Sequence, residues 1–385
     1  MIKVAIVHPS LNVAAGAEKV SIKIIESLKE LGLNVSLITI DKVKWELLVN
    51  KFITTLPDEE FFLERNDISY STSHDIKKFL KYYVKLLLAI HLLKKMRGFD
   101  YTISTHGETL NFMVDIAYVN SVPLMIPLNE EEEWLPKLNP IKKVYTEIFN
   151  ATSFLLEKKT FYISNSVFIR NILLRKWKIN SIVINPPVNV DVFKKLSGNR
   201  RRKNIVITIS RIKWNKGLSK IPSIARKTSS NVKFIIIGTL KGSSRNLIKY
   251  IIKKSKRLGV GNKVKILLDL KFSDMLEIIS KAKAYLHTMA NEAFGISIVE
   301  SMAAGCVPIV PRKGGPWTDI LDESQGIYGF AYENMDEAAY FIDNIIENDS
   351  LWRRISEAAT NRSTMFSEVR FKEKIKKVIL EKISM

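Results

Sequence analysis

The chain has 385 residues, 46% of them hydrophobic and 26% charged, and its 60 Lys and Arg against 39 Asp and Glu give a formal net charge of +21. This is the composition of a folded protein with one large or two medium domains, and the low Gly and Pro content excludes collagen-like and disordered chains. The single cysteine, Cys306, excludes an internal disulfide framework and a cysteine-based zinc site, and it favours a reducing compartment.

The positive excess predicts an anionic partner, and nucleic acid, an anionic membrane surface and phosphorylated substrates all satisfy it. The first residues, MIKVAIVHPS, have the pattern of a β-strand rather than of a secretory signal. No window offers the roughly 20 uninterrupted apolar residues of a spanning helix. We therefore expect a protein that is soluble or bound peripherally to a membrane.

The first half of the chain alternates strand-like and helix-like stretches. KVAIVHP is an apolar run suited to a parallel strand, GAEKVSIKIIESLKELG has a helical period that ends at Gly32, and NVSLITI is the next strand. DYTISTHGE, VDIAYVNSVP and TFYISNSVFIRNILL continue the alternation. Strands separated by helices predict a parallel sheet with helices on its faces.

Residues 75–97, DIKKFLKYYVKLLLAIHLLKKMR, carry lysines at both ends and an apolar middle. This pattern allows two interpretations, a helix buried within the first domain or an interfacial helix. In the second, leucines and aromatic rings enter lipid while the lysines stay at the headgroups. The segment is too short and too charged to span a bilayer.

A proline-bearing, charged connection divides the chain. Pro186 and Pro187 interrupt SIVINPPVNVDVF and the polar KKLSGNRRRKN follows, so we place the domain boundary near residues 187–200. NIVITISRI, VKFIIIGTL and KVKILLDL are then strands, while KGLSKIPSIARKTS, the basic SSRNLIKYIIKKSKRLGV and a stretch capped by Ser273 or Asp274 are helices. The sequence thus predicts an α/β protein of two doubly wound, Rossmann-like domains facing a cleft, with ligands at the strand carboxyl ends.

The stretch NEAFGISIVESMAAG predicts an anion-binding helix start. Gly295 permits a tight turn, and the apolar spacing is helical from Ile296, so backbone N–H groups from Phe294 onward lie at a helix N-terminus. Glu300, one turn into the helix, is suited to ribose hydroxyls, and Glu292 to sugar hydroxyls. The alternative is a capped amphipathic helix beside a strand, with Glu292 serving only as an acid favoured by the helix dipole.

A second loop, SRIKWNKG, places Arg211 and Lys216 after a predicted strand and before Gly217 and a helix. Arginine offers a planar fork to phosphate oxygens, and lysine a mobile point charge. Alone, such a loop is typical of solvated surface. Together with the helix start later in the same domain, it predicts a site for a nucleotide diphosphate.

SRIKWNKG and NEAFGISIVESMAAGCVPIV resemble the donor-binding motifs of the family 4 retaining glycosyltransferases, which have the GT-B fold. The family's two glutamates, separated by seven residues, are filled by Glu292 and Glu300, and HPSLNVAAGAEKV resembles its glycine-rich loop in the first domain. Within the family, LHTMANEAFGISIVESMAAG, GGPWTDI and NPPVNVDVF are most similar to the α-1,2-mannosyltransferases that extend lipid-linked oligosaccharides in N-glycan assembly.

The resemblance implies roles for the matching residues. Arg211 and Lys216 would hold the donor diphosphate and stabilise it as the leaving group, and Glu292 would complete the catalytic set by holding sugar hydroxyls. The donor would further be bound by residues of both domains, namely Gly16, Phe294, Gly295, Ile296 and Glu300.

The chain departs from the family pattern in its first domain. Ala15 stands where the family has a second glycine, and Asn120 stands where the subgroup often has a histidine. His106 is an alternative polar group there, so Asn120 and His106 are candidate contacts to the acceptor or donor. We expect His8 to shape its loop rather than to act as a base.

The resemblance also implies the reaction. A hexose, with mannose favoured, would pass with retention from a nucleotide-diphosphate sugar to a hydroxyl of a glycan acceptor linked to a lipid pyrophosphate. The donor would be GDP-mannose, or alternatively a UDP-sugar, and no metal or other cofactor is expected because Arg and Lys already supply positive charge.

The implied organisation is an acceptor-binding domain over 1–187, a donor domain over 188–365 and a C-terminal helix over 366–385 that packs back on the first domain. Because the basic surface and residues 75–97 suit an anionic membrane, we expect a cytoplasmic enzyme held peripherally at the cytoplasmic face of a membrane.

Three rival interpretations remain. One is a glycosyltransferase that uses a UDP-sugar and a soluble or polysaccharide acceptor, and another is a non-catalytic sugar-nucleotide-binding subunit, against which the intact donor motifs argue. The third is a nucleic-acid-binding protein. Against it, the basic residues are spread widely and no RNA-binding aromatic motif is present, so no nucleic-acid partner is expected.

Overall fold

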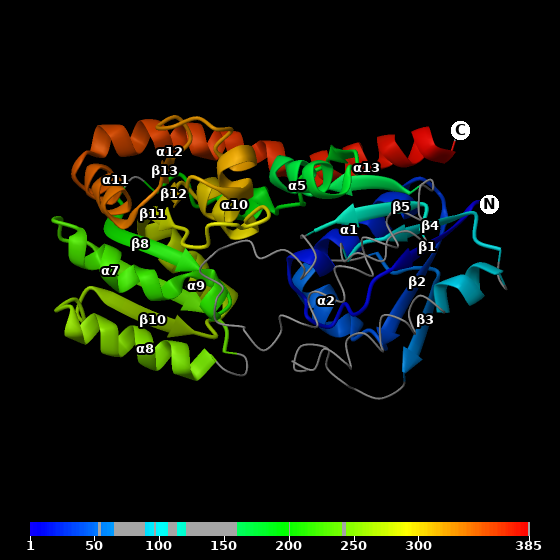
Figure 1. Ribbon diagram of the computed structural model, residues 1–385, viewed down its shortest axis with the longest axis horizontal. Coiled ribbons are helices and arrows are strands. Elements are labelled where there is room, and N and C mark those ends of the chain that lie inside the picture. The colour runs from blue at the N-terminus through cyan, green and yellow to red at the C-terminus, as the bar shows by residue number, and fades with distance from the viewer. Residues whose placement is uncertain are drawn as a thin grey trace. The chain divides into compact units, whose positions relative to one another are not determined.

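The computed structural model (Figure 1) describes residues 1–52, 55–64, 89–95, 98–106, 114–120, 160–199, 201–240 and 244–383. The chain divides into unit 1, which comprises Met1–Pro187 and Glu368–Met385, and unit 2, which comprises Val188–Ser367. The division after Pro187 falls at the proline pair that the sequence analysis takes as the boundary.

Unit 1 contains a parallel sheet whose strands lie in the order β3-β2-β1-β4-β5-β6-β7. The strands are β1 (Lys3–Val7), β2 (Asn34–Asp41), β3 (Glu59–Glu64), β4 (Tyr101–Ser104), β5 (Ile116–Val119), β6 (Phe161–Ser164) and β7 (Ser181–Val183). The helices with described bounds are α1 (Gly16–Glu30), α2 (Trp45–Phe52), α5 (Val167–Trp177) and α13 (Glu368–Ile383). The strand order reverses beside β1, as in doubly wound sheets.

Unit 2 contains a second parallel sheet, in the order β10-β9-β8-β11-β12-β13. Its strands are β8 (Lys203–Ile209), β9 (Lys233–Gly238), β10 (Val264–Leu268), β11 (Ala282–Leu286), β12 (Val307–Pro311) and β13 (Phe330–Tyr332). Its α-helices are α6 (Val190–Lys194), α7 (Ile221–Lys227), α8 (Ser244–Arg257), α9 (Phe272–Lys281), α10 (Ile296–Ala303), α11 (Met335–Glu347) and α12 (Asp349–Ser363). The predicted α/β class with two Rossmann-like sheets is confirmed.

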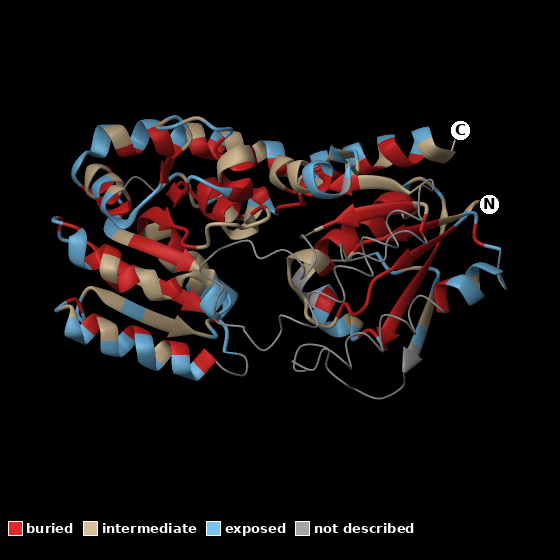
Figure 2. Cartoon of the chain, viewed as in Figure 1, coloured by how far each residue is buried: buried red, intermediate tan, exposed pale blue. Residues whose placement is uncertain are grey.

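Helices cover both faces of the second sheet. Core residues of α7, α8 and α11 pack on one face, around Phe234 and Ile236 of β9, and those of α9 and α10 pack on the other, around Tyr285 of β11. Strands β11 and β12 are fully buried, whereas the edge strand β10 is only partly buried, and Figure 2 shows α7 and α8 exposed on their outer sides. Burial on both faces explains why these strands are continuous apolar runs in the sequence.

Two helix boundaries differ from the predicted ones. The stretch from Lys216 onward was predicted as one helix. Instead, a 3-10 turn over Trp214–Lys216 and a second over Leu218–Lys220 flank Gly217 before α7, because Gly217 takes a left-handed conformation (φ 68°) that no continuous helix accommodates. The predicted cap of α9 at Ser273 or Asp274 is wrong as well. The helix begins at Phe272, so both residues lie in its first turn.

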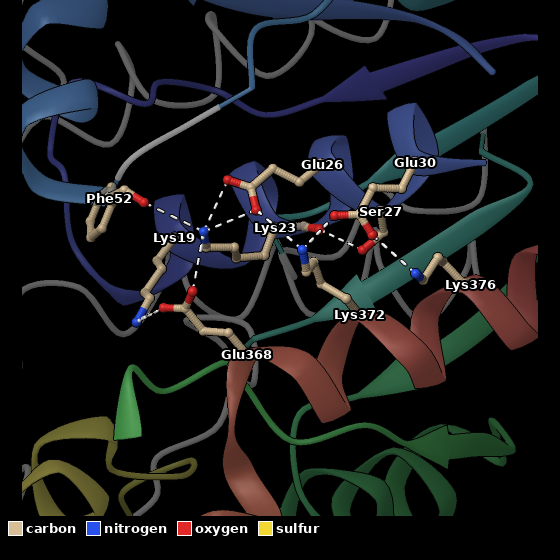
Figure 3. Close-up of polar contacts among 9 residues, drawn as sticks. All are labelled: Lys19, Lys23, Glu26, Ser27, Glu30, Phe52, Glu368, Lys372 and Lys376. Atoms are coloured by element: carbon tan, nitrogen blue, oxygen red, sulfur yellow. Dashed lines mark hydrogen bonds and ion pairs between the residues drawn. The ribbon is translucent and has the colours of Figure 1, made fainter. Parts of the chain in front are cut away.

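The C-terminal helix α13 packs on α1 within unit 1, and a network of ion pairs joins the two helices (Figure 3). Lys23 on α1 is buried, and its Nζ lies 2.9 Å from Glu26 Oε1 and 3.2 Å from Glu368 Oε2. Lys19 Nζ lies 2.8 Å from the other oxygen of Glu368. Nearer the end of α1, Glu30 pairs with two lysines of α13, Lys372 and Lys376.

Most of residues 75–97 lies outside the described residues, so the choice between a buried and an interfacial helix stays open there. Residues 89–95 are helical, and Ile90 packs in a small core with Val7, Ile38 and Phe99. Within the described part of the chain, no helix combines the length and apolarity needed to cross a membrane.

Candidate functional site

The loop after β8 is held against the loop after β11. A Cβ atom on Gly217 would overlap the carbonyl oxygen of Thr288, so only glycine fits this close approach. Thr288 Oγ1 donates a hydrogen bond of 2.7 Å to the carbonyl oxygen of Lys216. Because β8 and β11 are neighbouring parallel strands, both loops leave the same edge of the sheet.

Lys216 and Glu292, which are 76 residues apart, form an ion pair at this edge, with 2.5 Å between Nζ and Oε2. Both side chains are largely buried, with exposed fractions of 15% and 17%. Lys216 Nζ also lies 3.3 Å from Met289 Sδ. The two motifs that the sequence analysis assigned to one site therefore meet within unit 2.

The ion pair sets the charge of Glu292. Burial on its own would raise the pKa of Glu292, but the charges of Lys216 and Arg211, the His287 ring when protonated in acid, and the hydrogen bond from Lys216 outweigh it and hold the pKa below the ordinary value. Glu292 is therefore a carboxylate at neutral pH, and it offers its oxygens as hydrogen-bond acceptors.

His287 faces the same carboxylate from the end of β11, with 3.5 Å between Nε2 and Glu292 Oε2. Burial lowers the pKa of His287 to about 4, opposed by Glu292 and assisted by Lys216, so the ring is neutral at pH 7. Its Nε2 is buried and has no hydrogen-bond partner among the described residues. A buried, unpaired ring nitrogen beside a carboxylate is suited to a ligand hydroxyl.

Helix α10 begins beside this ion pair, at the residue that the spacing predicts. Gly295 precedes it in a conformation open only to glycine (φ 106°), and an added Cβ would lie 2.6 Å from Ile298 Cδ1. Phe294 is buried and packs edge-on against Phe366, with ring centroids 5.3 Å apart. The side chain of Phe294 thus anchors the turn, and the helix start carries the type of backbone N–H groups that bind anions in other proteins.

A glycine pair after β12 completes the turn. Gly315 donates a backbone hydrogen bond of 2.9 Å to the carbonyl oxygen of Glu292, and a Cβ on Gly315 would overlap the carbonyl of Ala293. A Cβ on Gly314 would lie 2.7 Å from the carbonyl oxygen of Glu292. Close packing therefore explains why both positions are glycine, since the absence of side chains lets two backbone segments touch and so fixes the position of Glu292.

The other candidates of unit 2 surround this center. Arg211 is exposed on the loop after β8, close enough for its charge to lower the pKa of Glu292. Glu300 is half-buried on α10. Burial raises the pKa of Tyr285 far above its ordinary value, and the charges of Glu292 and Glu300 add to that rise.

A separate polar cluster occupies the carboxyl edge of the sheet in unit 1. His8 follows β1 and is fully buried, with Nδ1 2.9 Å from Thr105 Oγ1 and Nε2 3.7 Å from Glu18 Oε1. The ring of His106 stands edge-on to that of His8, with centroids 5.3 Å apart. Burial, with His8 as a smaller cause, lowers the pKa of His106 to about 3, so this ring is also neutral.

The remaining candidates of unit 1 belong to the same edge. Gly16 is the first residue of α1, and the preceding Ala15 donates its N–H to Glu18 Oε2 over 2.8 Å. Asn120 Nδ2 donates to the carbonyl oxygen of Thr105 at 2.6 Å, and Asn165 Nδ2 donates to the carbonyl oxygen of Asn120 at 2.5 Å. Asn120 therefore bridges the ends of neighbouring strands.

Sequence reasoning assigned no role to His287, Thr288 or Asn165. His287 and Asn165 directly follow a strand at the carboxyl edge of its sheet, and Thr288 is the second residue after β11, so this position is the signal that would have found them. Among the described residues, no group of His, Cys, Asp or Glu side chains is arranged to hold a metal ion.

Comparisons with known proteins show what the chain is similar to. Residues 190–362 match the family described as glycosyl transferases group 1. In solved structures, the chain resembles a glycosyltransferase from Rickettsia africae (TM-score 0.69, 19% identity, 98% of each chain) and Anabaena HepE in complex with UDP and glucose (0.70, 18%, 99% and 100%). It also resembles sucrose-phosphate synthase from Thermosynechococcus elongatus (0.73, 15%, 100% of each chain). The fold is the GT-B fold, and most of unit 2 matches the glycosyl transferases group 1.

Its curated relatives are more specific. The chain is 27% identical over 226 residues to a protein of Dictyostelium discoideum and 26% identical over 253 residues to one of Homo sapiens. Both are named GDP-Man:Man(3)GlcNAc(2)-PP-Dol alpha-1,2-mannosyltransferase. The matches cover 55% and 61% of this chain and 44% and 51% of those proteins, so the chain spans about half the length of the relatives it matches.

Proposed function

We propose that this chain transfers a hexose, with mannose favoured, from a nucleotide-diphosphate sugar to a hydroxyl of a glycan acceptor carried on a lipid pyrophosphate. The observation that carries the proposal is the Lys216–Glu292 ion pair beside the start of α10, because it joins a cation, a carboxylate and an anion-binding helix end in one unit. The names of the curated relatives support GDP-mannose as donor and a lipid-linked acceptor.

In the proposed reaction, Arg211, Lys216 and the N-terminus of α10 bind the donor diphosphate. The bond between the sugar carbon and the diphosphate oxygen breaks, and its electron pair stays on the diphosphate. The acceptor hydroxyl forms the new bond to that carbon on the same face and releases its proton, so the configuration is retained. Positive charge aimed at the leaving group lowers the barrier most where water is excluded.

Lys216 is engaged with Glu292 before a donor arrives, so donor binding would change the partner of a largely buried cation. We propose that the diphosphate draws Lys216 toward itself and frees one oxygen of Glu292 for a sugar hydroxyl. His287 Nε2, which has no partner among the described residues, would take part in the same hydrogen-bond exchange. Glu300, one turn into α10, would bind the ribose of the nucleotide.

For unit 1 we propose that Gly16 lets the loop before α1 approach the donor and that His106 and Asn120 contact acceptor or donor. Since arginine and lysine supply the positive charge, the reaction would need no metal. The enzyme would act at the cytoplasmic face of a membrane that presents the lipid-linked acceptor.

The test is a transfer assay with labelled GDP-mannose and a lipid-linked oligosaccharide acceptor, with and without chelator. We expect chelator-insensitive transfer that yields an α-linked product. Transfer from a UDP-sugar to a soluble glycan would support the alternative glycosyltransferase instead. If donor binds but no acceptor is glycosylated, the chain is a non-catalytic binding subunit, and if no sugar nucleotide binds, the assignment fails.

A further inference from the structure

The net charge of the chain comes from one segment. Residues 192–268 hold 22 of the 60 Lys and Arg and none of the 39 Asp and Glu, so the other residues together carry 38 basic against 39 acidic side chains and are close to neutral. This corrects the expectation that the basic residues are spread widely. Seventy-seven consecutive residues without an acid require an explanation in terms of what this part of the fold meets.

The fold gathers this segment into one half of the sheet of unit 2. Strands β8, β9 and β10 are neighbours, and α7 and α8 pack together over them. On α7, Lys227 is compensated by Asp336 of α11, and near β8, Lys216 is compensated by Glu292. The charges of α8 are not neutralised in this way.

Helix α8 presents one apolar and one cationic side. Leu247 and Ile251 are buried in the core, while the basic side chains that point outward are Arg245, Lys249, Lys253, Lys256 and Arg257. None of these five makes an ion pair with any residue that the structure describes. A surface helix with five uncompensated cations repels itself, and an anionic partner would relieve that repulsion.

Two aromatic rings stand exposed next to these cations. Trp214 is 52% exposed and Tyr250 of α8 is 42% exposed, and their ring centroids lie 5.3 Å apart. Lys254 fixes this arrangement, since its Nζ donates to the carbonyl oxygen of Ser219 at 2.9 Å and lies 5.9 Å from the center of the Tyr250 ring. Ile252, on the same helix, is 46% exposed.

We propose that this surface, the α8 face, binds the anionic headgroups of a lipid bilayer. It consists of the five outward cations of α8 together with Trp214 and Tyr250. Attraction to an anionic bilayer surface stabilises the bound state of a protein with exposed lysines. Trp and Tyr side chains favour the level of the headgroups, because each has an apolar ring body and a polar tip. The exposed Ile252 suits lipid better than a phosphate backbone, so a bilayer is favoured over nucleic acid.

The inference rests on the proposed function only in that such a bilayer would carry the lipid-linked acceptor. It places the membrane contact in the donor-binding unit, next to the loop of Lys216, and it does not depend on residues 75–97. Membrane binding needs neither donor nor acceptor, so the two ideas fail separately.

The test is co-sedimentation of the full chain with vesicles of phosphatidylcholine alone and with roughly 30% phosphatidylserine, at low and high salt. The test variant is the triple substitution Lys249→Ala, Lys253→Ala and Lys256→Ala. The matched control removes three exposed charges from helices elsewhere, by Arg354→Ala, Lys374→Ala and Lys377→Ala. Alanine keeps helix propensity in both.

We expect wild type and control to bind only the anionic vesicles, and binding to weaken at high salt. The triple variant should bind them on the order of 100-fold more weakly, from about 1 kcal/mol per lysine. An equal loss of vesicle binding in the control variant would mean that only net charge matters, and it would overturn the proposal that the α8 face binds the bilayer.

Further measurements test the role of the aromatic rings, the alternative of nucleic-acid binding and the integrity of unit 2. Trp214→Ala should weaken vesicle binding while leaving salt dependence in place, because the ring contributes apolar contact rather than charge. A short RNA duplex that bound wild type tightly while anionic vesicles did not would overturn the proposal in favour of nucleic acid. Retained thermal stabilisation of the triple variant by a nucleotide sugar would show that unit 2 is intact.

Discussion

Lys216 is the residue on which the proposed chemistry depends most. It is largely buried, it faces Glu292 at 2.5 Å, and its loop is anchored by Thr288 and by the close approach at Gly217. Because the loop that carries Lys216 is already fixed, only the ammonium group has to change partner when a diphosphate arrives, so little further ordering is needed. Such preorganisation is the main source of electrostatic catalysis.

Replacing Lys216 with alanine should lower kcat by about 100- to 1000-fold, because one preorganised partner of the leaving group is lost. The fold should persist, with a lower melting temperature because Glu292 loses its buried cation. Lys213→Ala, at an exposed position in the same loop, is the control and should leave kcat within a fewfold of wild type. Steady-state kinetics and circular dichroism check both, and near-normal turnover without Lys216 would contradict its role.

His287 gives the site a pH dependence of defined sign. Its pKa is about 4 in the folded protein against an ordinary 6.5, so between these values the unfolded chain binds the proton more tightly. The contribution of the neutral ring to the free energy of unfolding is therefore fully present above pH 6.5. It is lost as the pH falls toward 4, by up to about 1.4 kcal/mol per pH unit.

The measurement is the melting temperature of wild type and His287→Gln between pH 7 and pH 4. The variant lacks the titrating ring, so its curve should be flatter over that window. Parallel curves would mean that His287 does not titrate as the structure implies.

At the scale of elements, glycine decides whether the loops after β8 and β11 meet. Gly217 and Gly259 have similar left-handed φ angles, 68° and 70°, but only Gly217 has backbone atoms where a Cβ would lie. Gly259→Ala should lower the free energy of unfolding by about 1 kcal/mol, because only the backbone conformation becomes unfavourable. Gly217→Ala should cost clearly more and should also weaken donor binding, since the loop must move away from Thr288.

Chemical denaturation and donor titration of the two variants separate these effects. Equal losses of stability would show that the loops do not touch as described.

The α1–α13 network makes a second prediction for an element. Lys23 is the buried cation shared by Glu26 and Glu368, whereas Lys376 lies nearer the surface and pairs with Glu30 (Figure 3). Lys23→Met should destabilise unit 1 by about 3 kcal/mol, because two carboxylates lose their buried partner. Lys376→Met should cost 1 kcal/mol or less, as surface pairs do. Thermal unfolding compares them, and similar shifts would contradict a structural role for the buried pair.

The elements show what a sequence can and cannot predict. The β1–α1–β2 unit and the start of α10 followed from local patterns, namely apolar runs, a helical period and a glycine at the turn. α2 and β3 were missed, since α2 is short and β3, EEFFLE, lacks a clear apolar alternation at the edge of its sheet. The turns before α7 were missed because the left-handed Gly217 is set by a contact with the distant Thr288.

For the site, the two loop motifs and the family resemblance that they carry selected the candidates, whereas the residue types alone left structural alternatives open. The pairing of Lys216 with Glu292 was not predictable in detail, because only the neighbouring strands β8 and β11 bring them together. The neutral state of His287 was equally hidden, since it results from burial rather than from sequence neighbours.

At the scale of the whole molecule, the fold and the match to the glycosyl transferases group 1 point to the same class of enzyme. The group 1 match covers residues 190–362, and the curated relatives are matched over about half their length. The proposed function therefore depends on unit 2 binding a nucleotide-diphosphate sugar at the Lys216–Glu292 pair.

The most direct test is a calorimetric titration of the full chain with GDP-mannose, UDP-glucose and ADP-glucose, repeated on the double variant Arg211→Ala, Lys216→Ala. We predict that GDP-mannose binds wild type and that the double variant binds it at least 100-fold more weakly, because it lacks both cations proposed to face the diphosphate. Binding of no sugar nucleotide to wild type, or equal affinity in the double variant, would contradict the proposed function.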